Sequence, residues 1–73
     1  MVMGMLWLDD DKSRSLEEKV KRAVAYYRDK YGQSPELCLV NKAMLAETQQ
    51  VDQVQVRPAG NVILHHFWVG RES

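Results

Sequence analysis

The sequence has one cysteine, two prolines and no excess of either charge, and each shortage excludes a class of protein. Because Cys38 is the only cysteine, no disulfide can form within the chain, which points to a reducing compartment. Ten acidic and ten basic residues give a formal net charge of zero. A domain that binds nucleic acid mainly through phosphates is clearly basic, so nucleic acid is not the partner that this composition indicates.

Long apolar runs and the common site motifs are also missing. The apolar run over residues 2–8 is too short to span a bilayer or to form the core of a cleaved signal peptide. No glycine-rich phosphate loop, nucleophile elbow, CxxC pair or HExxH motif is present, and no zinc-finger spacing occurs. We therefore expect a cytoplasmic chain with no membrane segment and no cofactor, and nothing in it argues for an enzyme.

What is present is the composition of one small globular domain covering residues 1–73. Hydrophobic residues make up 45% of the chain and charged residues 27%, which is ordinary for a folded protein. A domain of this length buries only about 60% of the surface of its unfolded chain, so its stability margin is thin. Such domains usually need a disulfide, a metal or a partner chain. With the first two excluded, oligomerisation is the support that remains.

The clearest predicted element is an amphipathic helix over residues 15–31. Ser15 followed by Glu18 has the spacing of a capping box, and Gly32 is placed to end the helix. The apolar residues at helical spacing are Leu16, Val20, Ala23, Val24, Tyr27 and Tyr31.

Four strands and a second, short helix complete the predicted α+β fold, in the order β-α-β-(short α)-β-β. The predicted strands are 3–8, 37–40, 51–57 and 62–69, and the short helix is 42–47. The first two strands, joined through a helix, should run parallel. The last two should form a hairpin around the turn at 58–61. A single mixed four-stranded sheet results, with the long helix on one face.

The other face of that sheet is the main indication of function. The predicted last strand is apolar on both sides, and one long helix cannot cover two faces of a sheet. An exposed apolar patch marks an interaction site. We therefore expect a non-enzymatic interaction domain that forms a homodimer or binds another protein through an aromatic-rich sheet face. The expected interface residues are Trp7, His66, Phe67 and Trp68.

A second hypothesis is a small metal-dependent hydrolase or nuclease. Asp9, Asp10 and Asp11 follow the first strand, where carboxylates can be aimed at one Mg²⁺. Acidic residues before a helix also simply favour its N-terminus, which is the structural alternative. His65 and His66 are further candidate ligands, but neighbouring residues of a strand point to opposite faces, so both can bind one metal only across a bulge.

A third hypothesis is weak nucleic-acid binding through the long helix. Lys19, Arg22 and Lys30 form a basic stripe with Tyr26 among them. The structural alternative is a solvated helix face whose long side chains lie along the surface. Cys38, in an all-apolar strand, is expected to be a buried small hydrophobe and not a nucleophile.

Two stretches resemble small bacterial proteins of unknown function. They are KYGQSPELCLVN at residues 30–41 and HFWVG at residues 66–70. The resemblance implies a bacterial, cytosolic setting, and it implies no catalytic residue.

Overall fold

The computed structural model describes residues 2–72, which form one α+β unit with a single helix and a single mixed sheet. The elements in chain order are β1 (Val2–Leu8), α1 (Leu16–Tyr31), β2 (Leu37–Asn41), β3 (Gln49–Val51), β4 (Val54–Ala59) and β5 (His66–Glu72).

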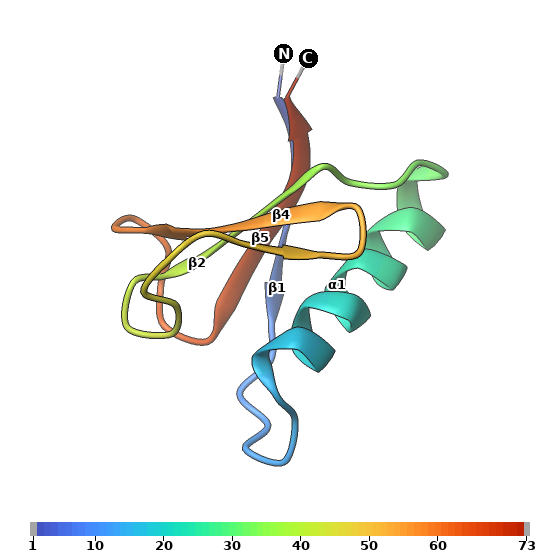
Figure 1. The fold of residues 1–73 in the computed structure, drawn as a ribbon. Helices are drawn as coiled ribbons and strands as arrows, with labels where there is room; N and C mark the ends of the chain where they lie inside the picture. The colour runs from blue at the N-terminus through green and yellow to red at the C-terminus, as the bar shows by residue number, and fades with distance from the viewer. Residues whose placement is uncertain (1, 73) are drawn as a thin grey trace.

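The sheet has five strands in the order β1-β5-β2-β4-β3. Neighbouring strands are antiparallel except β2 and β4, which are parallel. The last strand, β5, therefore lies between β1 and β2. Those two strands run in the same direction, as expected, but they are not neighbours. The start of β1 lies beside the end of β5, so the two ends of the chain are close together (Figure 1).

Local chemistry fixes both ends of α1. Ser15 has extended backbone angles, φ −71° and ψ 164°, and its Oγ accepts a hydrogen bond from the Glu18 N–H at 3.2 Å. At the other end Gly32 adopts the left-handed conformation, φ 72°, and its N–H donates to the Arg28 carbonyl at 2.8 Å. Only glycine adopts that conformation without a steric cost, so the helix stops there.

The core lies between α1 and one face of the sheet (Figure 1). The helix contributes Val20, Ala23 and Tyr27, all fully buried. Buried residues that face them from the strands are Met5, Cys38, Val40, Val51, Val54, Val56, Phe67 and Val69. They come from all five strands, because β3 and β4 curl towards the helix at the far side of the sheet.

The number of strands and the hairpin differ from the prediction. The hairpin joins β3 to β4 through Asp52 and Gln53, and β2 separates β4 from β5. Val51 pairs with Val54 across this turn, and both are buried. Residues three apart in one continuous strand would point to opposite faces, so the two valines reach the core only because the chain turns back.

The predicted short helix over 42–47 is replaced by a turn. The Asn41 side-chain oxygen accepts from the Ala43 N–H at 2.8 Å, and the Asn41 carbonyl accepts from the Met44 N–H at 2.9 Å. The second bond spans three residues and closes a turn instead of a helical ring. Met44 and Leu45 still pack against the core, now from a loop.

The last strand begins four residues later than predicted. Residues 62–65 form a loop, and His65 adopts a left-handed conformation with φ 67°. The His66 N–H donates to the Ile63 carbonyl at 3.0 Å, which closes a turn immediately before β5. The apolar residues of this loop therefore do not extend the strand pattern.

Candidate interaction surface

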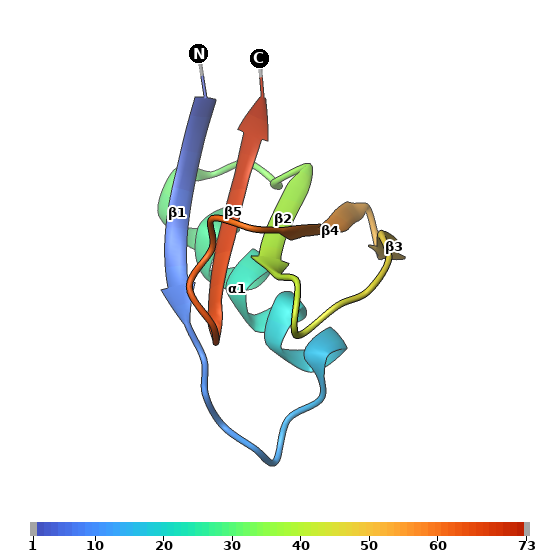
Figure 2. The same cartoon turned by 90° about the vertical axis from the view of Figure 1, so that its left-hand side faces the viewer.

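The face of the sheet away from α1 carries a contiguous apolar surface. Figure 2 views the molecule from this side, with β1, β5 and β2 in front of the helix. Phe67 and Val69 are buried under α1, so the alternating residues His66 and Trp68 lie on the opposite face. The register aligns Leu6, Trp68 and Leu39 in one row across β1, β5 and β2.

Trp68 packs against the backbone of β1 at Gly4. A Cβ atom at Gly4 would come within 2.1 Å of the Trp68 ring, far inside van der Waals contact, so the ring needs the missing side chain. Glycine in the interior of a strand often marks such a close approach. The indole ring, which is half-buried, therefore forms an aromatic platform over Gly4 on the open face.

Large apolar side chains on β1 and in the loop before β5 are exposed. Leu6 is 58% exposed and Leu8 57%, both on β1. Ile63 and Leu64, in the loop before β5, are 67% and 45% exposed. Single exposed leucines are common on protein surfaces, but several near an aromatic platform are typical of a contact surface.

The same face becomes polar towards the other edge of the sheet. β4 presents Gln55 and Arg57 there, and the Arg57 Nε donates to the Gln55 side-chain oxygen at 2.6 Å. Gln50 of β3 lies beside Gln55 and is exposed. The open face therefore has an apolar half over β1, β5 and β2 and a polar half over β4 and β3.

The loop from residue 60 to 65 overlies part of the apolar half. It leaves β4, crosses in front of β5 on the open side of the sheet and then turns down to enter β5 (Figures 1 and 2). The Asn41 side-chain amide holds it by donating to the Val62 carbonyl at 2.9 Å, and the Asp9 N–H donates to the His65 carbonyl at 3.0 Å. Val62 is buried by these contacts, although it lies outside the core under the helix.

The four predicted interface residues divide between the two faces. His66 and Trp68 lie on the open face, and the His66 Nδ1 is 3.1 Å from the Leu64 carbonyl. Phe67 is fully buried in the core and cannot contact a partner. Trp7 pairs with Phe67 across the strands and packs on Tyr26 of α1, with ring centroids 4.7 Å apart. Adjacent residues of a strand point to opposite faces, so Phe67 does not share the face of Trp68. Trp7, which pairs with Phe67, lies on the same face as Phe67 and is not part of the open surface either.

Sequence reasoning missed Gly4, Leu6, Leu8 and Leu39 as members of this surface. The signal that finds the two leucines of β1 is strand alternation, because Leu6 and Leu8 alternate with the inward residues Met5 and Trp7. The position of Leu6 opposite Trp68 depends on β5 pairing with β1. That pairing joins the two ends of the chain and leaves no local trace in the sequence.

The carboxylates of the acidic segment after β1, residues 9–11, form hydrogen bonds and ion pairs within their own loop. The Asp9 side chain accepts from the Asp11 N–H at 3.1 Å, and Arg14 pairs with Asp11 at 3.0 Å. Asp11 also accepts from the Ser13 hydroxyl and N–H, and these bonds are the main cause of a pKa held below its ordinary value of 3.8. Asp10 is exposed. The carboxylates of Asp9 and Asp11 thus stabilise the turn that leads into α1.

The histidines do not join these acids in a ligand set. Asp9 and His65 meet through their backbones, in the bond already described. Over residues 2–72, no group of three or more His, Cys, Asp or Glu side chains could hold a metal ion. A metal-dependent hydrolase or nuclease using Asp9 to Asp11 with His65 or His66 therefore has no geometric support.

The predicted basic stripe is divided by burial. Lys19 is only 8% exposed, whereas Arg22 and Lys30 are exposed. The Lys30 ammonium lies 5.5 Å from the centre of the Tyr31 ring. Two separated cations on one helix form a much weaker phosphate-binding surface than a continuous stripe.

Cys38 lies in the core with its thiol fully buried. Burial raises the pKa of this thiol from 9.0 to about 12, because the low-polarity surroundings penalise the thiolate. The residue acts as a small hydrophobe at neutral pH.

Within the part of the chain that the structure describes, no helix is both long and apolar enough to cross a membrane. No family model, curated protein or solved structure matches the chain.

Proposed function

We propose that this protein is a small non-enzymatic interaction domain that self-associates through the apolar half of its open sheet face. The observation that carries the proposal is the row of Leu6, Trp68 and Leu39, which no helix covers. Packing the open faces of two copies together would form a sandwich with the two helices outside. Sheets that pack in this way keep their side chains interdigitated in a common core.

Charge supports a second copy as the partner. Among the residues that β1, β5 and β2 present in the rows from Leu6 to Leu8, His66 is the only ionisable one. Two identical surfaces meet on a two-fold axis, so any strong charge would face its own kind across the axis. Like-charge contacts cost several kcal/mol at an interface, and on β1, β5 and β2 these two rows carry no acid and no lysine or arginine.

Stability supports the same partner. The chain has 73 residues and one cysteine, which leaves it with a small core and no internal crosslink. A dimer through the open face would bury apolar side chains that are more than half exposed in the monomer, such as Leu6 and Leu8. Each square ångström of apolar surface buried contributes about 25 cal/mol. A reducing, cytoplasmic setting remains our expectation for a chain whose one thiol is free.

The test is the molecular mass of matched variants in solution. Leu6→Lys places a charge on the apolar half, opposite Trp68, and Gln50→Lys places the same charge on the polar half of the same face. Both positions are on edge strands, where lysine is well tolerated. We expect light scattering to give a dimer for the wild type and for Gln50→Lys, and a monomer for Leu6→Lys.

Circular dichroism of both variants would show whether the fold is retained. A wild-type protein that is monomeric at every concentration would contradict the proposal. A Leu6→Lys protein that keeps the dimeric mass would contradict the choice of surface.

A further inference from the structure

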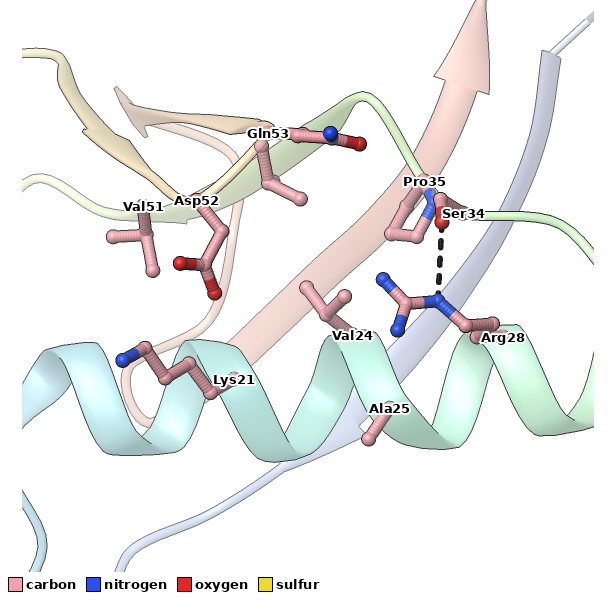
Figure 3. A pocket seen from close by; sticks show the side chains of 10 residues that line it. Lys21, Val24, Ala25, Arg28, Ser34, Pro35, Val51, Asp52 and Gln53 are labelled. Carbon is pink, nitrogen blue, oxygen red and sulfur yellow. Dashed lines mark hydrogen bonds between the residues drawn. The ribbon is translucent and has the colours of Figure 1, made fainter.

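A groove of about 490 Å³ lies on the helix side of the sheet, away from the open face. It is bounded by α1, by the turn of the β3–β4 hairpin and by the connection from α1 to β2 (Figure 3). Small-molecule sites usually have volumes of about 300–1,000 Å³. The groove is therefore large enough for a ligand of a few carbon atoms.

Half of the residues that line the groove are apolar. Val24 of α1 lies on the helix side of the groove, with Pro35 of the connection and Val51 of the hairpin on the other side (Figure 3), and Val54 of the hairpin also lines it. Pro35, Val51 and Val54 are buried and Val24 is half-buried, so the walls are held by the core behind them. A ligand with a short hydrocarbon body would find a preformed surface here.

Arg28 stands at one end of the groove with its guanidinium held in place. Its Nε donates to the Ser34 hydroxyl at 3.0 Å, and Figure 3 shows the two terminal nitrogens on the side of the groove. Among residues 2–72 these terminal nitrogens make no hydrogen bond and no ion pair. A guanidinium fixed through Nε presents a planar fork that matches the two oxygens of a carboxylate.

The charges of Lys21 and Asp52, at the other end of the groove from Arg28, determine how much negative charge a bound anion can carry. Lys21 lies two helical turns before Arg28, about 10 Å along the axis, and Asp52 reaches from the hairpin towards that end. Two cations and one anion give the lining a net charge of +1. A singly charged ligand balances this charge, whereas a dianion would meet repulsion from Asp52.

We propose that this groove binds a small monocarboxylate with an apolar body. The carboxylate accepts hydrogen bonds from the terminal nitrogens of Arg28, and the hydrocarbon part packs against Val24, Pro35 and Val54. The site does not depend on self-association, because it lies on the opposite side of the sheet from Trp68.

The experiment is an amide chemical-shift titration of the full chain with three probes. Isovalerate carries a carboxylate on a branched hydrocarbon, isovaleramide has the same shape without charge, and inorganic phosphate has charge without a hydrocarbon. We expect saturable shifts at Val24, Arg28 and Val54 with isovalerate, and no saturable shifts there with the other two probes.

Two variants separate the charges. Arg28→Gln should weaken isovalerate binding about tenfold, because a charge-assisted hydrogen bond is lost. Asp52→Asn should leave binding equal or tighter, and asparagine tolerates the left-handed conformation, φ 53°, that residue 52 adopts. Lys42→Gln, away from the groove, is the control and should change nothing.

Three results would overturn the proposal. They are the absence of saturable shifts with isovalerate, unchanged binding by a folded Arg28→Gln protein, and phosphate binding as tight as that of isovalerate. The last result would identify a general anion site.

Discussion

The two faces of the sheet are formed by the same strands but differ in burial, because α1 covers only one of them. Phe67 and Val69 of β5 are fully buried under α1, while the intervening Trp68 lies on a face that no helix covers. On β1, Met5 is buried and Leu6 beside it is 58% exposed. The open face is thus also apolar over β1, β5 and β2, but Trp68 and Leu39 are only half-buried there and Leu6 and Leu8 are exposed. That mismatch between composition and exposure is the reason to infer a partner.

The largest effect is expected on the covered face. Phe67→Ala removes a fully buried ring and leaves a cavity, which should lower the free energy of unfolding by about 3–5 kcal/mol. Leu39→Ala, on the open face of the neighbouring strand, should cost much less in a monomeric background such as Leu6→Lys. Urea denaturation of both would measure the difference. Equal costs would contradict the distinction between the two faces.

The reactivity of the Cys38 thiol measures how tightly the covered face is closed, and it needs no mutation. Its pKa of about 12, raised from 9.0 by burial, makes the thiolate about a thousandfold rarer at neutral pH than in an exposed cysteine. We expect native protein to react with a thiol reagent only as fast as it unfolds, and urea to release normal reactivity. Fast reaction of the native protein would show that the core opens readily.

Gly4→Ala tests the platform on the open face. The added methyl group would overlap the Trp68 ring, so the ring must move or the strands must separate. Overpacking of this kind costs about 1–3 kcal/mol, and the displaced ring should also weaken self-association. Denaturation and light scattering of the same variant would check both effects. Unchanged stability and unchanged mass would mean that the ring does not rest on Gly4.

The smallest effect is expected in the acidic loop, outside both faces. Because folding lowers the pKa of Asp11, chiefly through hydrogen bonds from Ser13, its ionised form stabilises the native state above the ordinary pKa of 3.8. That contribution is lost as the pH falls through the lower, folded-state pKa. Asp11→Asn should therefore flatten part of the acid limb of a stability–pH curve. An unchanged acid limb would show that ionisation of Asp11 does not stabilise the native state.

Local signals in the sequence predict the helix well. The Ser15 cap, the Gly32 stop and the apolar spacing all agree with α1, because each depends only on neighbouring residues. Strand β2 is also close to its predicted range, since a short apolar run bounded by polar residues is a local pattern. Both elements were predictable from sequence for this reason.

Pairing between distant strands is what the sequence does not reveal. The signals for a turn at residues 58–61 are strong, so they favoured a hairpin there over the one at Asp52 and Gln53. The insertion of β5 between β1 and β2 depends on contacts between the two ends of the chain. Half of the candidate surface follows from that insertion, which is why the sequence indicates Trp68 as a member of the surface and does not indicate Leu6.

The most direct test of the central claim is an isotope-filtered NMR experiment on a mixture of labelled and unlabelled protein, which detects only contacts between different copies. We expect intermolecular contacts between the Trp68 ring and the methyl groups of Leu6 and Leu39. Intermolecular contacts at Tyr26 on the helix instead, or none at concentrations where the labelled protein is fully folded, would contradict self-association through the open face.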